Sequence, residues 1–147
     1  MNRPRISFFA YVGLSALGAL ASWLTSSAEV TGVAAVVSAK NSITTLSKSQ
    51  IADIFWGKAN RFPNGSLAVP IDQSEGSAER DDFYEKLAGK SPAQMKTYWA
   101  KVIFTGRGQL PKAVLDSIEM KARVASDPQA IGYMDVSLLD DGVRALP

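Results

Sequence analysis

Residues 67–80 read LAVPIDQSEGSAER and combine the patterns of a strand, a loop and a helix start. The apolar run 67–71 is typical of a strand, and Pro70 predicts that its end lies at a sheet edge or leaves the sheet. The polar loop 72–77 contains a glycine that permits a tight turn, and Ser77 is the expected N-cap of the next helix. A strand that leads through such a loop into a helix presents free backbone N–H groups and the positive end of a helix dipole, which attract anions.

This loop is the candidate ligand-binding site of the chain. Its serines can add hydroxyl donors to the backbone N–H groups, and Arg80 can supply a full positive charge. A simpler interpretation stays open, in which Ser77 only caps its helix and Gly76 only permits the turn. The predicted anion site consists of Gln73, Ser74, Glu75, Gly76, Ser77 and Arg80.

Further strand and helix patterns alternate along the chain. The run 33–38 (VAAVVS) and the run 130–134 (AIGYM) are short, apolar and rich in residues that favour buried strands. Helical patterns lie between these strands, and no internal repeat or linker divides the chain. The alternation predicts one α/β domain, a small mixed sheet flanked by about four helices.

The helix starts are marked by specific residues. Ser47 with Gln50, and Ser91 with Gln94, have the serine-to-glutamine spacing of a capping box. A further helix is expected to start after Ser77. The helix after Ser91 is expected to turn Met95, Tyr98, Trp99, Val102 and Ile103 inward, and a fourth is expected to begin at Pro111 with Val114, Leu115, Ile118 and Val124 facing inward.

The N-terminal region has the three parts of a secretory signal peptide. Arg3 and Arg5 make its start basic, residues 6–24 (ISFFAYVGLSALGALASWL) are uncharged, and residues 26–28 (SSA) are small, as signal peptidase requires. Export to the periplasm or secretion is therefore expected. The alternative is an uncleaved N-terminal helix that anchors the protein, because nineteen uncharged residues approach the ~20 that span a bilayer.

Cleavage would divide the chain into a signal peptide, residues 1–28, and an α/β domain, residues 29–147. The signal peptide contains two of the sixteen basic residues and no acidic one, so the formal charge would fall from +2 to 0, with fourteen of each sign. A nucleic-acid partner is therefore not expected. The membrane is expected to be contacted only through the N-terminal segment, and only if that segment is kept.

Cysteine and histidine are both absent from the sequence. Their absence excludes disulfides, thiol nucleophiles, lipid-modified cysteine, zinc sites built on these residues and Ser-His-Asp catalysis. Acidic residues around the helix start at Ser77 could form the carboxylate pair of a hydrolase, although the helix dipole alone favours acidic residues there. We expect no enzyme activity, no metal and no cofactor.

Three segments have patterns that occur together in one protein family. Residues 46–58 (LSKSQIADIFWGK) are similar to a Leu-Ser…Ile-Phe-x-Gly-Lys stretch, residues 73–83 (QSEGSAERDDF) to a phosphate loop Arg-Ser-Asp-Gly-Ser-Gly-Thr-Thr-x-x-Phe, and residues 127–133 (DPQAIGY) to a Gly-Ala-Ile-Gly-Tyr strand. In this order they resemble the second lobe of the phosphate-type substrate-binding proteins of ABC transporters, which have the type 2 periplasmic-binding fold. The likeness covers residues 33–134.

The resemblance implies one lobe of a transport protein that binds phosphate or a similar oxyanion reversibly. Gln73 stands where the family has a phosphate-binding arginine, and Ala78 and Glu79 stand where it has glycine and threonine. The loop therefore keeps its shape but has less positive charge. Two lobes need roughly 200 residues, so the second wall of the site would come from a partner in the cell envelope, or ligand would bind weakly. The alternative function is a periplasmic interaction or sensor accessory module that has lost small-ligand binding.

Overall fold

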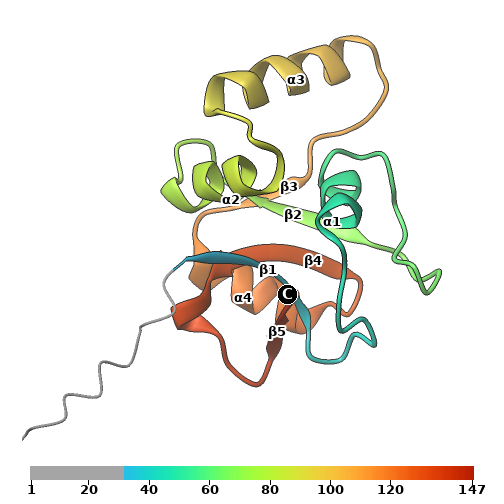
Figure 1. Ribbon diagram of the computed structural model, residues 1–147, viewed down its shortest axis with the longest axis vertical. Helices are drawn as coiled ribbons and strands as arrows, with labels where there is room; N and C mark the ends of the chain where they lie inside the picture. Colours follow the sequence, from blue (N-terminus) through green and yellow to red (C-terminus); the bar gives the residue numbers. More distant parts are fainter. Residues whose placement is uncertain (1–31) are drawn as a thin grey trace, which may run out of the picture.

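A five-stranded mixed sheet forms the framework of the described part of the chain, residues 32–147, in this computed structural model (Figure 1). The expected signal peptide, residues 1–28, lies outside the described residues. The strands are β1 (Val33–Ser38), β2 (Val69–Gln73), β3 (Lys112–Val114), β4 (Ala130–Asp135) and β5 (Val143–Ala145). Their order is β3-β2-β4-β1-β5. Strand β2 is parallel to both neighbours, whereas β1 is antiparallel to β4 and β5.

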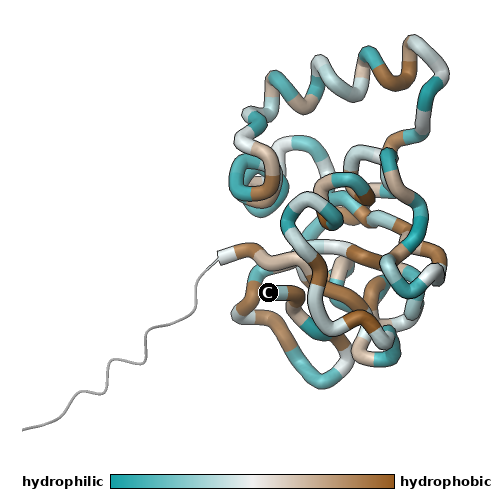
Figure 2. The backbone as a smooth tube through the Cα atoms, turned by 45° about the vertical axis from the view of Figure 1, so that its right-hand side comes forward, coloured by the Kyte–Doolittle hydropathy of each residue, from teal (hydrophilic) through white to brown (hydrophobic). Residues whose placement is uncertain are grey.

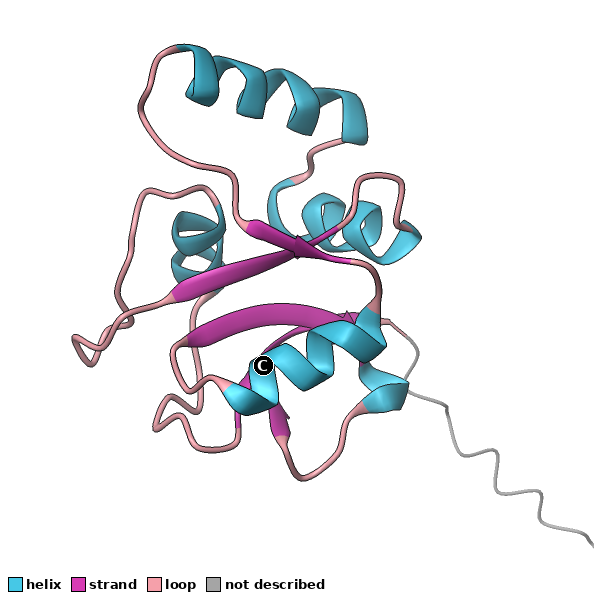
Figure 3. Cartoon of the chain, turned by 180° about the vertical axis from the view of Figure 1, so that it is seen from behind, coloured by secondary structure: helices cyan, strands magenta, loops and turns pink. Residues whose placement is uncertain are grey.

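Four α-helices cover the two faces of this sheet in the described residues (Figure 3). Helices α1 (Lys48–Phe55) and α2 (Ala78–Ala88) pack on one face, α3 (Pro92–Phe104) lies above them, and α4 (Ser117–Ser126) packs on the opposite face. A short 3-10 helix, Val136–Leu138, precedes β5. The predicted fold class, a small mixed sheet flanked by about four helices, is confirmed.

Both predicted capping boxes are present. In each, the serine Oγ accepts a hydrogen bond from the glutamine N–H, and the glutamine side chain accepts one from the serine N–H, for Ser47 with Gln50 and for Ser91 with Gln94. These bonds satisfy N–H groups that the first turn of a helix leaves without partners. Local sequence therefore determined where α1 and α3 begin.

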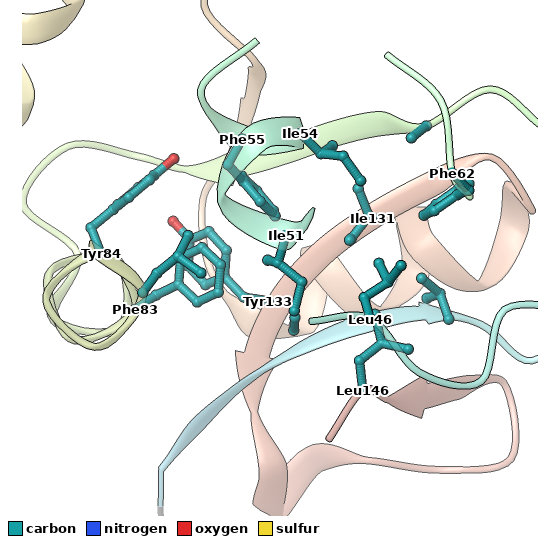
Figure 4. Packing of buried hydrophobic residues seen from close by; sticks show 14 of the residues in the cluster. Leu46, Ile51, Ile54, Phe55, Phe62, Phe83, Tyr84, Ile131, Tyr133 and Leu146 are labelled. Atoms are coloured by element: carbon teal, nitrogen blue, oxygen red, sulfur yellow. The ribbon is translucent and has the colours of Figure 1, made fainter. Parts of the chain in front are cut away.

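The sheet separates two apolar clusters, because successive side chains of a strand point to opposite faces. Val37 of β1 and Tyr133 of β4 belong to the cluster under α1 and α2, whereas Val36 and Met134 belong to the cluster under α4. Aromatic rings and aliphatic side chains pack together in the first cluster (Figure 4). Phe83 stacks on Tyr133 with ring centroids 4.0 Å apart, and Phe55 meets Phe83 edge-on at 5.0 Å.

Strand β2 differs from the predicted strand in the residues that it covers and in its location within the sheet. It covers residues 69–73, so Asp72 and Gln73 belong to the sheet and not to the following loop. The strand is also interior, although Pro70 predicted an edge or an exit. Val69 N–H donates to Gln129 on the β4 side, so the ring of Pro70 faces the other side, where pairing with β3 begins only at Ile71. The missing N–H of proline therefore removes no bond between strands.

The prediction of a helix that begins at Pro111 is wrong. Residues 112–114 form β3, which pairs in parallel with residues 71–73, and α4 begins after Asp116, whose side chain accepts a hydrogen bond from Glu119 N–H. Leu115 and Ile118 are 71% and 67% exposed. Hydrophobic spacing could not reveal that the edge of β2 was free to pair with this segment.

Helix α3 buries only part of its expected apolar face. Met95 and Trp99 are buried, but Ile103 is 53% exposed, contrary to the prediction. Phe104 is 93% exposed, and Figure 2 shows the apolar end of α3 projecting from the body of the protein. No helix of residues 32–147 is both long enough and apolar enough to span a bilayer.

Gly132 of β4 is expected to tolerate no side chain without loss of stability. A Cβ atom at this position would lie 2.3 Å from Met120 Sδ and 3.1 Å from Val124 Cγ2. We expect Gly132→Ala to lower the free energy of unfolding by about 1–3 kcal/mol, because overpacking displaces α4 side chains. Urea denaturation measures this loss. The loss should shrink in a Met120→Ala background, and an equal loss in both backgrounds would contradict the explanation.

Candidate functional site

The predicted anion loop lies at the carboxyl end of β2, between the first turns of α2 and α4. Ser77 caps α2, since its Oγ accepts a hydrogen bond from Arg80 N–H at 3.3 Å. Gly76 has a φ of 90°, which glycine adopts without strain. The structural roles expected for Ser77 and Gly76 are therefore confirmed, and a ligand role would come in addition to them.

The side chain of Gln73 makes several hydrogen bonds at the carboxyl end of β2. Its side chain is buried, its Oε1 accepts a hydrogen bond from Ser77 Oγ at 2.7 Å, and its Nε2 donates to Glu79 Oε2 at 2.7 Å. The same Nε2 lies 3.3 Å from the backbone oxygen of Tyr133. The uncharged Gln73 side chain thus connects β2, the loop and the first turn of α2.

The carboxylate of Glu79 accepts hydrogen bonds from two side chains at this site. Besides Gln73 Nε2, it accepts a hydrogen bond from the hydroxyl of Ser117, at the start of α4. Ser117 is 2% exposed, and its Oγ also accepts the N–H of Asp135. A carboxylate uses such donors in the same way as a phosphate oxygen does. Glu79 therefore occupies the side-chain donors of Gln73 and Ser117.

Arg80 is paired with a buried carboxylate next to the loop. Its Nε donates to Asp72 Oδ2 at 3.3 Å, and the two residues are 8% and 4% exposed. Tyr84 donates its hydroxyl to the same oxygen at 3.0 Å, and the Tyr133 hydroxyl donates to Oδ1. The guanidinium carbon of Arg80 also lies 5.3 Å from the centre of the Tyr84 ring. The positive charge of Arg80 is thus largely balanced inside the protein.

The surroundings keep the side chains that donate to Asp72 in their protonated states. Burial raises the pKa of Tyr84 and of Tyr133 far above the ordinary value, and the neighbouring Asp72 raises both further, so both phenols stay protonated and donate. Burial, the largest effect, lowers the pKa of Arg80, but Asp72 together with Tyr84 and Tyr133 raises this pKa by more, so the guanidinium stays charged.

Two other predicted site residues, Ser74 and Glu75, are more exposed than Gln73 and Arg80. Ser74 Oγ donates to the backbone oxygen of Val114 at 3.2 Å, which ties the loop to β3. Glu75 is exposed, with Lys96 Nζ 3.9 Å from its carboxylate. Among residues 32–147 the N–H groups of Ala78 and Glu79 have no acceptor, as is usual in the first turn of a helix.

Two important residues of the site were not predicted as such. The sequence pattern places Asp72 in the loop, and the helix expected from Pro111 would have Ser117 in its interior. Their positions depend on the pairing of β2 with β4 and on the start of α4, neither of which is visible in the local sequence. The described residues contain no group of three or more acidic side chains that could hold a metal ion.

The fold is similar to that of known phosphate-transport proteins. A putative phosphate ABC transporter substrate-binding protein from Clostridium perfringens, solved with bound phosphate, is 27% identical, with a TM-score of 0.60 over 79% of this chain and 44% of its own. An ABC-type phosphate transport receptor from Vibrio cholerae is 20% identical, with a TM-score of 0.60 over 79% and 45% of the two chains. PstS from Borrelia burgdorferi is 16% identical, with a TM-score of 0.60 over 79% and 46%.

The sequence matches no protein-family model and no curated protein. The chain spans less than half the length of the three solved structures. Its fold is that of a single periplasmic-binding-protein-like domain. Within that class, it resembles the phosphate ABC transporter substrate-binding proteins.

Proposed function

We propose that this protein is an exported solute-binding-like protein that binds a small oxyanion such as phosphate, in competition with its own Glu79. The proposal rests on one observation, that the Glu79 carboxylate accepts hydrogen bonds from Gln73 and Ser117 at the end of β2. A carboxylate held in this way marks a set of donors suited to an anion. The ligand would bind reversibly, and no bond chemistry is involved.

The bound anion would contact two of the residues expected from the sequence, together with Ser117 and the backbone of the first turn of α2. Gln73, Ser77 and Ser117 would supply side-chain donors, and the N–H groups of Ala78 and Glu79 would supply backbone donors with the positive end of the α2 dipole. Ser74, Glu75 and Gly76 would shape the loop, and Arg80 would act indirectly, because its charge is paired with Asp72 next to the loop.

The proposal includes export. The signal-peptide pattern of residues 1–28 supports it, and so does the likeness of the described residues to a substrate-binding protein and a transport receptor. Residues 29–147 would then act in the periplasm or outside the cell. A protease-protection experiment on intact cells and spheroplasts, with the full chain expressed, would test this location.

Glu79→Gln is expected to tighten phosphate binding by about tenfold or more. The substitution keeps the size of the side chain but removes a negative charge, and two like charges about 4 Å apart repel by several kcal/mol near a protein surface. Isothermal titration calorimetry with phosphate measures the change. Glu85→Gln is the matched control, because Glu85 lies exposed on the same helix and its replacement changes the net charge equally. Absence of phosphate binding in both variants would contradict the proposal.

The second candidate function is a periplasmic interaction or sensor accessory module. A specific observation favours it: Gln73, Ser77 and Arg80 all have hydrogen-bond partners within the protein, so the loop is stable without a ligand. Apolar side chains at the end of α3 are also exposed, Phe104 at 93% and Ile103 at 53%. If neither Glu79→Gln nor the unchanged protein binds phosphate, this function becomes the better explanation of the fold.

A further inference from the structure

A second pocket lies away from the β2–α2 loop, between the end of α1 and one side of α3. Its volume is about 360 Å³, and its apolar wall consists of Trp56, Tyr98, Trp99 and Val102. None of the loop residues 72–80 lines it. Small-molecule sites have this character, since they are concave, mostly apolar and lined by aromatic rings, and their volumes begin at about 300 Å³.

The aromatic wall is held in a defined arrangement. The rings of Trp56 and Tyr98 meet edge-on with centroids 4.4 Å apart, and those of Tyr98 and Trp99 do so at 5.2 Å. Tyr98 also donates its hydroxyl to the backbone oxygen of Trp56 at 2.9 Å, which joins α3 to the end of α1. Rings fixed in this way offer a planar ligand a preformed surface and lose little conformational entropy on binding.

One donor in this wall lacks an acceptor. Trp99 Nε1 is buried and makes no hydrogen bond within residues 32–147. A buried donor without an acceptor is uncommon, because it loses its bond to water and gains nothing in return. The Nε1–H group of Trp99 therefore reports on any molecule that packs against the Trp99 ring.

The rim of the pocket is positively charged. Lys58, Lys101 and Arg107 line it, all three are exposed, and the pocket has no acidic lining residue in the described part of the chain. Within residues 32–147 none of the three has a carboxylate oxygen within 4.0 Å. Their charges therefore stay uncompensated at the mouth of an aromatic pocket, a combination that attracts an anion with a planar apolar body.

We propose that this pocket binds a small aromatic carboxylate. The aromatic ring of the ligand packs against Trp56 and Tyr98, and its carboxylate lies toward Lys101 and Arg107 on the rim. A ligand of about ten non-hydrogen atoms fits the volume and is expected to bind with a Kd on the order of 1 mM. The site is independent of the oxyanion proposal, because the two share no residue.

Phenylacetate is the probe that tests this site, with 2-phenylethanol as its uncharged analogue. In the ¹⁵N-labelled protein, obtained by expression of the full chain, phenylacetate is expected to shift the Trp99 Nε1–H resonance along a saturable curve. A Trp99→Phe variant assigns that resonance. The uncharged analogue should bind at least about threefold more weakly, because it cannot form charge-assisted bonds with the rim.

Variants of the rim separate this site from nonspecific binding. The double variant Lys101→Gln with Arg107→Gln is expected to weaken phenylacetate binding by about fivefold or more, since each exposed pair contributes up to about fivefold. The double variant Lys90→Gln with Lys96→Gln is the matched control, because it also removes two exposed positive charges and neither residue lines this pocket. No saturable shift, equal affinity for the two probes, or unchanged affinity in the double variant would each overturn the proposal.

Discussion

Asp72→Ala is expected to lower the free energy of unfolding by about 3–5 kcal/mol. The carboxylate of Asp72 is 4% exposed and accepts hydrogen bonds from Arg80, Tyr84 and Tyr133. Its removal would leave the charge of Arg80 buried without a counter-ion and would leave two buried hydroxyls without an acceptor. Each of these losses is costly where water cannot replace the missing partner.

Urea denaturation followed by circular dichroism measures the loss. The control is Asp82→Ala, which removes an ion pair with Lys86 whose side chains are 40% and 57% exposed, and it should change stability by less than about 1 kcal/mol. In the double variant Asp72→Ala with Arg80→Met, part of the loss should be recovered, because no charge remains buried. Equal losses in Asp72→Ala and Asp82→Ala would show that the buried network does not stabilise the fold.

The double variant Gln73→Arg with Glu79→Thr is expected to raise the affinity for phosphate by about 100-fold or more. It restores the arginine and the threonine that the resembled family has at these positions of the loop. Arginine binds phosphate through two charge-assisted hydrogen bonds, each stronger than a neutral one, and the loss of Glu79 removes a repelling charge. Calorimetric titration with phosphate measures the change.

The single variants distinguish this explanation from a general effect of charge. Gln73→Arg alone should gain little, because the new guanidinium would pair with the Glu79 carboxylate, which accepts a hydrogen bond from position 73. Glu79→Thr alone should gain an intermediate amount. If the double variant binds phosphate no better than Glu79→Thr does, the side chain at position 73 does not contact the ligand, and the proposed site is wrong.

The sequence by itself determined the features that depend on neighbours along the chain. The capping boxes at Ser47 and Ser91 and the cap at Ser77 satisfy helix N–H groups with side chains one turn away, so they act in any fold that keeps the helix. The buried runs of β1 and β4 were equally clear, because both faces of an interior strand are apolar.

The tertiary structure alone decided the pairing of β3 with β2, the start of α4 and which side chains meet at the candidate site. Residues 112–114 have no strong preference for a strand and pair because a free edge of the sheet lies beside them. Glu79 meets Ser117, and Asp72 meets Tyr133, across 38 and 61 residues of chain. Contacts of this kind depend on which elements pack together, and the local pattern of residues does not record that choice.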